Sequence, residues 1–515
     1  MHSYLPLAAE DRGSNDENAG VNLSNIAVGM GATMEGMDSN KRQSGGSVVV
    51  GMSQMDDAFA STISTVPVPV PASRTQTQNN SPVPISRPPT KPRDGLFAVA
   101  FLAHFVVVGL LGFVKTTGGL EASVILYSVA GSWSSMTMIV ILLGGSFGIM
   151  VCALIASGEW RETVLSLGIL LSITMQACLG NVLLLLQSRY SFLGIFILAS
   201  ALLDSCSYKK ARENMSFTSA LIQMVVEIFK AYGLSLAGLC VGVIVIQTCT
   251  LLWWGAFFVD LISNVSTTYA EYLIVLMALS LYWIASFFHA LMSYLVGGCV
   301  LWYFVRPEGD RFAPAKRVML HLHCGMTTSL GSICKGALFC PLADRVLAVH
   351  NWSSRSTYSR GSAVTNFFKN AALTLTNLLV REARRFHRLT FCLTATYGRT
   401  LCKAAEEQLL FHPETIDISI EDNTAYILAA TATELAGLVS IVFGVVAERR
   451  QGDSWPLFFF VCFCLSYCGL SLAIHAYSSA VDAIIVAFAA TPEKFARENQ
   501  IVFLRFIRHT ETGLR

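Results

Sequence analysis

Charged residues are scarce in this chain. Lys, Arg, Asp and Glu together make up 14% of the 515 residues, whereas hydrophobic residues make up 53%. A soluble domain carries about 25% charged residues, so the chain lacks the polar side chains that would cover a water-facing surface. This scarcity excludes an ordinary soluble protein and indicates an integral membrane protein. The net charge of +2 gives no reason to expect a nucleic-acid partner.

The motifs of several common chemistries are also missing. No CxxC pair occurs among the 14 cysteines, and most of them lie in apolar runs, where a thiol acts as a small hydrophobic group. His321 and His323 are two residues apart, about 200° around a helix, so they do not share a face. The sequence contains no Walker A motif, no GxSxG with triad partners and no HExxH. We therefore expect no metal site, no cofactor and no enzymatic activity.

The N-terminal segment has neither the basic region nor the apolar core of a signal peptide. It is rich in Ser, Asn, Thr, Gly and Pro, and VPVPVPA and SPVPISRPPTKPRD are typical of extended linkers. We expect residues 1–93 to be a disordered cytoplasmic tail. Residues 94–492 are then the transmembrane domain, and residues 493–515 are a cytoplasmic C-terminal tail.

Long apolar runs begin at Gly95. About twenty apolar residues cross a bilayer as a helix, so we expect an all-α polytopic membrane protein with about ten crossings. The predicted spans are Gly95–Val114, Met136–Ala156, Thr163–Leu186, Ser191–Leu203, Ala231–Val259, Tyr272–Val305, Val318–Val349, Gly361–Val380, Asn423–Ala447 and Pro456–Ala490. Met215–Lys230 is amphipathic and is expected at the membrane interface. Leu389–Leu410 is expected to be a cytoplasmic amphipathic helix, either a lid over an inner opening or an inert surface helix.

The connectors between the runs differ in their content of Lys and Arg. Arg306–Arg317 and the segment REARRFHR (Arg381–Arg388) belong to the basic set. Basic loops face the cytoplasm, which places both termini there. Two Asn-x-Ser sequons, at Asn264 and Asn351, fall in the opposite set. They are expected glycosylation sites on the outer side.

The predicted span Val318–Val349 contains a row of small residues and a lysine. The small residues are Gly325, Ser329, Ser332 and Gly336. Their spacings of four, three and four place them on one face of a helix, a helix-packing seam that lets neighbouring backbones approach. Lys335 therefore need not face lipid. It is expected to line a cavity, to pair with Glu434 or to extend toward the interface.

Other polar and aromatic residues lie inside apolar runs. Glu434 is expected to act in a substrate or proton path or to form a structural ion pair. Asp482 is expected to be a hydrogen-bonding residue near a helix end. Trp283 and Phe288 lie deep in their run, and an aromatic face attracts a quaternary ammonium group by about 0.5–2 kcal/mol. Ordinary packing is the alternative for each of these rings.

Four segments, taken in order, resemble the choline transporter-like family of solute carriers. HALMSYLVGGCVLWYF (His289–Phe304) is similar to the family pattern NVxHVTxxGxxxxWYF, and Lys316–Phe339 is similar to RAxxxHLGSxxxGSL. Asn423–Gly437 resembles the NxxAYI segment, and Tyr477–Phe488 resembles YxxxVDxxxxCF. The sequence departs from the family pattern after AYI, where Glu434 occupies an uncharged position.

The resemblance implies transport of choline or a related amine such as ethanolamine. We expect facilitated or proton-coupled movement of this cation through a site at the middle of the bilayer. Trp283 and Phe288 would present aromatic faces, Glu434 would supply negative charge, and His289 and Tyr426 would orient the substrate by hydrogen bonds. The plasma membrane is the expected location, with internal membranes as the alternative.

Two other functions remain open from the sequence. The chain could transport another amine, such as a polyamine, or a neutral metabolite, and competition by choline would separate these substrates. It could instead be a membrane scaffold or lipid-binding protein that transports nothing. Partners recovered without measurable flux would favour that alternative.

Overall fold

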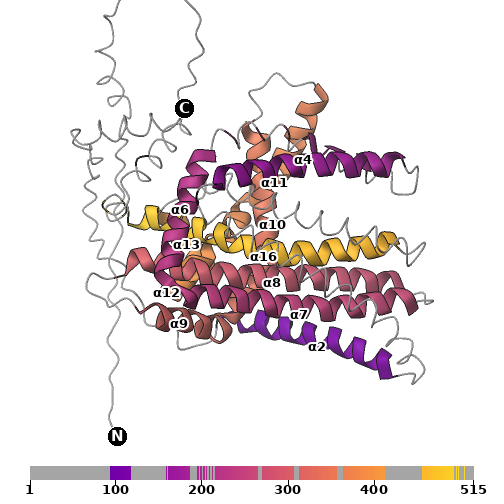
Figure 1. Ribbon diagram of the computed structural model, residues 1–515, viewed down its shortest axis with the longest axis horizontal. Coiled ribbons are helices and arrows are strands. Elements are labelled where there is room, and N and C mark those ends of the chain that lie inside the picture. Colours follow the sequence, from indigo (N-terminus) through magenta and orange to yellow (C-terminus); the bar gives the residue numbers. More distant parts are fainter. Residues whose placement is uncertain are drawn as a thin grey trace, which may run out of the picture. The chain divides into compact units, whose positions relative to one another are not determined.

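A computed structural model describes residues 93–117, 160–185, 215–264, 270–306, 313–355, 363–411 and 455–491, with single residues at 158, within 194–212, and at 495, 497 and 504. Every element of regular secondary structure in these ranges is a helix (Figure 1). The all-α fold class is confirmed for this part of the chain. The tail before Arg93 and the predicted span Asn423–Ala447 lie outside the described residues, so the tail's disorder and the ten crossings stay predictions.

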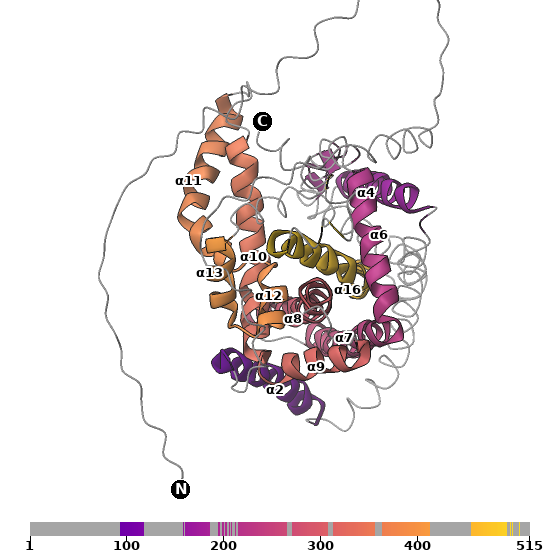
Figure 2. The same cartoon turned by 90° about the vertical axis from the view of Figure 1, so that its left-hand side faces the viewer.

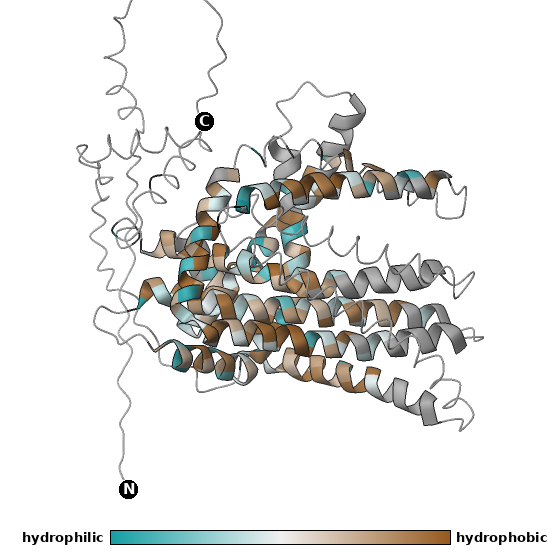
Figure 3. Cartoon of the chain, in the orientation of Figure 1, coloured by the Kyte–Doolittle hydropathy of each residue, from teal (hydrophilic) through white to brown (hydrophobic). Residues whose placement is uncertain are grey.

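Three described helices are long and apolar enough to cross a membrane. They are α7 (Leu234–Asn264), α8 (Ala270–Val305) and α16 (Trp455–Ala490), with qualifying segments Leu234–Gly255, Val275–Val305 and Leu470–Ala490. α7, α8 and α16 lie side by side along one direction, and hydrophobic residues cover much of their length (Figures 1 and 3). α2 (Gly95–Thr117) contributes a shorter apolar segment and packs against α8.

The amphipathic segment predicted at the membrane interface is packed into this bundle. It forms α6 (Met215–Tyr232), which contacts α4 (Arg161–Leu185) and α7, and its Leu221 and Val225 are fully buried. Gly233 separates α6 from α7 with a φ of 58°. This left-handed conformation is one that glycine adopts without steric cost, so the chain can turn there.

The prediction of one helix over Val318–Val349 is wrong. α9 (Pro314–Met326) ends before the seam is complete, and α10 (Leu330–Arg355) follows after a break. The backbone N–H of Arg93 donates to the carbonyl of Thr328 at 2.9 Å, so a distant part of the chain satisfies one polar group of the broken turn. α10 runs across the direction of α7, α8 and α16 (Figures 1 and 2).

The single cytoplasmic helix predicted over Leu389–Leu410 is also wrong. After α11 (Ala363–Arg385), the chain forms a short helix α12 (Thr390–Tyr397) and then α13 (Leu401–Phe411). Gly398 ends α12 with a φ of 59°, a common helix C-terminal conformation. Most α12 residues are buried, so α12 is not an inert surface helix, and its role as a lid stays a prediction.

Two adjacent glycines of α8 allow α12 to approach it. A Cβ atom on Gly298 would lie 2.5 Å from the Cβ of Ala395, and one on Gly297 would lie 3.0 Å from the Cβ of Cys392. Larger side chains at either position would therefore push α12 away from α8. This close packing brings the residues that precede α12 into the centre of the bundle.

Candidate functional site

A row of polar side chains lies between the two spans α8 and α16. His289 and Ser293 on α8, and Ser471, His475 and Ser479 on α16, recur every four residues and so share one face of their helix. His289 Nε2 lies 3.1 Å from Ser471 Oγ, and Ser293 Oγ lies 2.8 Å from His475 Nε2 and 3.1 Å from Ser479 Oγ. We call these five side chains the polar stripe.

The polar stripe satisfies its own hydrogen-bonding groups. The hydroxyl of Ser479 donates to the His475 carbonyl at 2.8 Å, and that of Ser471 donates to the Cys468 carbonyl at 3.2 Å. The rings of His289 and His475 meet edge to face, 4.8 Å apart. Polar groups left unpaired in an apolar interior are costly. Polar side chains that persist in membrane spans commonly mark function.

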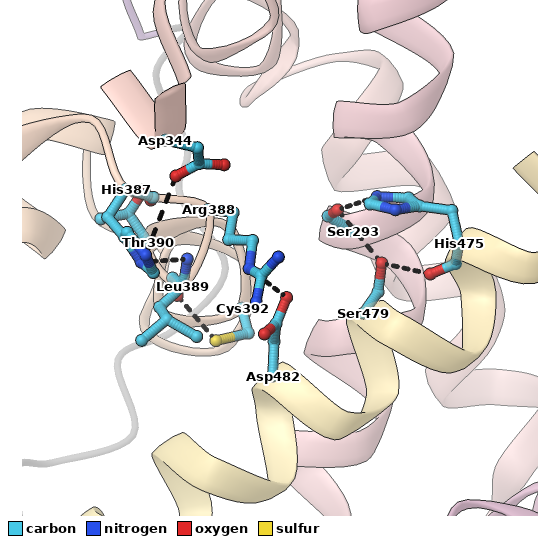
Figure 4. Close-up of polar contacts among 10 residues, drawn as sticks. All are labelled: Ser293, Asp344, His387, Arg388, Leu389, Thr390, Cys392, His475, Ser479 and Asp482. Atoms are coloured by element: carbon cyan, nitrogen blue, oxygen red, sulfur yellow. Dashed lines mark hydrogen bonds and ion pairs between the residues drawn. The ribbon is translucent and has the colours of Figure 1, made fainter. Parts of the chain in front are cut away.

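An ion pair lies at the end of the polar stripe. Asp482 follows Ser479 by less than one turn of α16, and its Oδ2 lies 3.1 Å from Nε of Arg388 (Figure 4). The side chains of Arg388 and Asp482 are 22% and 8% exposed, so water screens the pair little. Asp482 is therefore in a buried ion pair, not the helix-end hydrogen-bonding residue that we expected. Arg388, predicted in a cytoplasmic connector, is carried inward by the packing of α12.

A second carboxylate lies on the other side of Arg388. Asp344 of α10 lies near the backbone N–H of Arg388, and its Oδ1 lies 3.8 Å from His387 Nε2 (Figure 4). His387 lies in the connector between α11 and α12. Burial, with a smaller effect of the Arg388 charge, lowers the pKa of His387 to about 3. The imidazole is then neutral at physiological pH, and its contact with Asp344 is not an ion pair.

The turn that carries Arg388 is held by local hydrogen bonds. The hydroxyl of Thr390 donates to the His387 carbonyl at 2.7 Å, and the N–H of Leu389 donates to His387 Nδ1 at 3.3 Å. These bonds fix the backbone of the turn. They therefore hold the backbone beside Arg388 in place.

The structure places Trp283 and His289 on different sides of α8. The indole Nε1 of Trp283 donates to the Cys334 carbonyl of α10 at 3.3 Å, and its ring lies 5.4 Å from the ring of Phe101 on α2. His289 instead contacts α16. Phe288 is buried against Phe287, with ring centroids 5.5 Å apart. The aromatic residues of the predicted cation site are therefore in a packed cluster, and His289 is not brought to it.

Two other predicted site residues, Tyr426 and Glu434, lie outside the described residues. Their roles stay predictions, and so does the pairing of Lys335 with Glu434. Lys335 Nζ lies 3.7 Å from Asp94 Oδ1 and 3.1 Å from Cys402 Sγ. Asp94 immediately precedes α2, and sequence reasoning did not identify it as a partner.

The small residues of the predicted seam each lie against another element. A Cβ on Gly325 would lie 3.1 Å from Tyr294, whose hydroxyl donates to Ser329 Oγ at 3.2 Å. Ser332 Oγ donates to Asp94 Oδ2 at 2.7 Å, and a Cβ on Gly336 would overlap the ring of Phe391. The four positions therefore hold α9 and α10 against different neighbours.

The two predicted glycosylation sites lie at or inside helices. Asn264 is the last residue of α7, and Asn351 lies within the last turns of α10. Glycosylation at either residue stays a prediction. Within the described ranges, no three His, Cys, Asp or Glu side chains are grouped closely enough to hold a metal ion.

Comparison with known families identifies the architecture around the polar stripe. Residues 193–493 match the family described as plasma-membrane choline transporter. The chain belongs to this family. The matched residues include the whole polar stripe, Arg388, Asp344 and Asp482, so the site lies within the segment that defines this choline transporter family.

Individual relatives are distant. Protein PNS1 of Kluyveromyces lactis is 22% identical over 56% of this chain, and a CTL-like protein of Dictyostelium discoideum is 24% identical over 59%. The chain spans about half the length of these two relatives, 55% and 54%. Protein PNS1 of Debaryomyces hansenii is 21% identical over 81% of this chain and 86% of its own length. Identities at this level place the chain in a transporter family without fixing its substrate.

Proposed function

We propose that the protein moves choline, or a related small organic cation such as ethanolamine, across a membrane. The family to which the chain belongs supports transport of a small cation. The structural observation that carries the proposal is the polar stripe between α8 and α16, which ends at the carboxylate of Asp482. Such polar contacts also pack membrane helices together, and they differ from apolar packing in that a polar solute can replace them.

The chemistry of the polar stripe suits a small, hydroxylated cation. Serine hydroxyls and imidazole nitrogens both donate and accept hydrogen bonds, so they can replace the water that a hydroxyl such as choline's loses on entry. Asp482 would balance the positive charge. Glu434 and Tyr426 would contribute from the span Asn423–Ala447.

The presence of His289 and His475 in the polar stripe favours a proton-coupled mechanism. His289 and His475 lie in the polar stripe with their rings 4.8 Å apart, and because burial disfavours a charged imidazole, each would take up a proton only when the stripe opens to water. Uniport without protons is the alternative mechanism. We further propose the plasma membrane as the location, with both termini in the cytoplasm.

Uptake by the purified full-length protein in liposomes tests the proposal. Radiolabelled choline should accumulate saturably relative to protein-free vesicles, and excess unlabelled choline or ethanolamine should block it more strongly than spermidine. Block by spermidine alone would indicate a polyamine substrate. The absence of uptake from folded protein, with bound lipid or partner proteins recovered, would favour the scaffold or lipid-binding alternative.

A pH gradient across the same liposomes tests the coupling. An imposed proton gradient should change the initial rate of choline uptake, and His475→Gln should remove this dependence because it removes a protonatable group from the polar stripe. A rate that does not depend on the gradient in the wild-type protein would leave uniport as the mechanism.

A further inference from the structure

Arg388 lies between two carboxylates that come from two different helices. Its Nε lies 3.1 Å from Oδ2 of Asp482 on α16 (Figure 4), and Asp344 of α10 lies near its backbone N–H. The neutral imidazole of His387 adds no charge beside Asp344. Arg388 therefore has one carboxylate at its guanidinium, and a second, Asp344, lies close enough for the Arg388 charge to act on it.

Asp482 continues the row of polar residues on α16. Ser471, His475, Ser479 and Asp482 are spaced by four, four and three residues, which keeps them on one face of the helix. A cation that follows the polar stripe therefore arrives at Asp482. It finds the carboxylate already paired with the guanidinium of Arg388.

We propose that Asp482 binds the positively charged group of the substrate. Arg388 forms an ion pair with Asp482 in the absence of substrate and so competes with it for this carboxylate. On binding, the guanidinium moves from Asp482 to Asp344, and the substrate takes its place. This inference rests on the proposed function, because it takes the substrate to be an organic cation.

The charges of the cluster favour a monovalent substrate. Burial raises the pKa of Asp344 to about 7, so above that pH Asp344, Arg388 and Asp482 together carry a charge of −1. A buried site is stable when its charges are balanced, and one monovalent cation balances this one. A polyamine would bring a second positive charge into the bundle next to Arg388, where like charges repel strongly.

The exchange has a measurable energetic consequence. A ligand whose site is open in only a fraction of the molecules binds with an affinity reduced by that fraction. If Arg388 covers Asp482 in about nine of ten molecules, removing the guanidinium tightens binding about tenfold. Removing the carboxylate has the opposite effect. The two partners of one ion pair therefore change substrate affinity in opposite directions.

Equilibrium binding of radiolabelled choline to the purified full-length protein tests this prediction. Arg388→Gln should lower the Kd for choline about tenfold, and Asp482→Asn should raise it by at least about tenfold, because a charge-assisted contact is lost. Asp344→Asn should also raise the Kd, since Arg388 loses its second position. Combining Asp344→Asn with Arg388→Gln should restore the tight binding of Arg388→Gln alone.

A purely structural ion pair would give a different pattern. Arg388→Gln and Asp482→Asn would then both weaken binding, and the exchanged pair Arg388→Asp with Asp482→Arg would restore it. Either result overturns the inference. If Arg388→Gln does not fold, Arg388→Lys provides the second test: a lysine pairs less well with a carboxylate than an arginine, so choline should bind several-fold more tightly, and unchanged or weaker binding overturns the inference.

The wild-type protein separates this inference from the proposed function. If the wild-type protein binds choline and Arg388→Gln does not bind it more tightly, the competitor role is wrong and cation transport stands. If neither binds choline or ethanolamine, the proposed substrate class is wrong and the inference falls with it. Binding that is detectable only in Arg388→Gln supports the inference, because the competitor then masks the site.

Discussion

The two sides of α8 offer its neighbours different groups. The side toward α2 and α10 presents the rings of Trp283 and Phe287, and the one N–H of this indole is bonded to a backbone carbonyl of α10. The side toward α16 presents His289 and Ser293, which are bonded to side chains of α16. One side is held by ring packing and the other by paired polar side chains.

This difference separates what packs the bundle from what can act on a solute. A backbone carbonyl of a helix and a close-packed ring offer nothing that a passing solute can replace. A contact between two side chains can be exchanged for a contact between each side chain and a solute, so little hydrogen bonding is lost. Under the proposed function, the aromatic side of α8 serves folding and its polar side serves transport.

The largest expected effect tests the aromatic side. Trp283→Ala should lower the free energy of unfolding by about 3 kcal/mol, the lower end for buried tryptophans because this ring is only half-buried. Choline uptake per folded molecule should change little. Thermal unfolding in detergent and uptake normalised to folded protein measure the two quantities.

An exposed aromatic residue of the same helix is the control for Trp283. Tyr272 is 75% exposed, so Tyr272→Ala should change stability by less than about 0.5 kcal/mol. Unchanged stability of Trp283→Ala together with much weaker choline binding would reverse the assignment. It would place the cation at Trp283, as the sequence suggested.

A smaller loss of stability is expected where α12 meets α8. Gly298→Ala places a methyl group 2.5 Å from the Cβ of Ala395, so α12 must shift, at a cost of about 2 kcal/mol. The matched control is Gly242→Ala on α7, where nothing lies within 4 Å of the added atom. That variant should be neutral or up to about 1 kcal/mol more stable. Equal melting temperatures for the two variants would contradict the close packing of α12.

The polar side should respond in uptake more than in stability. Ser293→Ala removes one hydroxyl that contacts both His475 and Ser479. We expect choline uptake to fall about tenfold, which corresponds to about 1.4 kcal/mol, while stability falls by about 1 kcal/mol.

A second serine on α8 provides the control for Ser293→Ala. Ser280 is 1% exposed, and its hydroxyl has no hydrogen-bond partner in the part of the chain that the structure describes. Ser280→Ala should leave uptake at the wild-type level. A similar loss from both variants would show that buried serines of α8 are equivalent, and it would remove the distinction between its two sides.

The smallest expected effect is at Lys335, away from both sides of α8. Lys335→Met removes the ion pair with Asp94. The side chains of Lys335 and Asp94 are 17% and 19% exposed. The expected loss of stability is about 1 kcal/mol or less, with uptake unchanged. Added salt should reduce the difference from the wild-type protein, and Lys403→Met on the exposed side of α13 should show no difference at all. A loss of uptake in Lys335→Met would add Lys335 to the transport path.

The long apolar helices could be predicted from the sequence. The predicted starts and ends of Tyr272–Val305 and Pro456–Ala490 agree with α8 and α16 to within two residues. Length and hydropathy decide such helices, and both are local properties of the chain. The breaks at Gly233, Gly398 and between α9 and α10 were missed. At the last of them a backbone carbonyl accepts a hydrogen bond from Arg93, a distant contact that no local pattern encodes.

The candidate site was predictable only in part. The spacing of His289 and Ser293, and of Ser471, His475 and Ser479, is a signal that a search for polar residues four apart in apolar runs would find. The sequence does not show that the polar residues of α8 face those of α16, because this depends on how the helices pack. Arg388 was assigned to a cytoplasmic connector because its neighbours are basic. Its burial follows from the glycine pair of α8, which admits α12.

The contacts of Asp94 with Ser332 and Lys335 also set an order of events during synthesis of the chain. Asp94 bonds to Ser332, which follows it by 238 residues. At about 5–20 residues per second, a ribosome needs roughly 10–50 s to make the intervening segment. Asp94, at the start of α2, therefore cannot bond to Ser332 until α10 has been synthesised. A nascent chain stalled before α10 would present an unpaired Asp94 to quality-control factors, which could distinguish it from the finished protein.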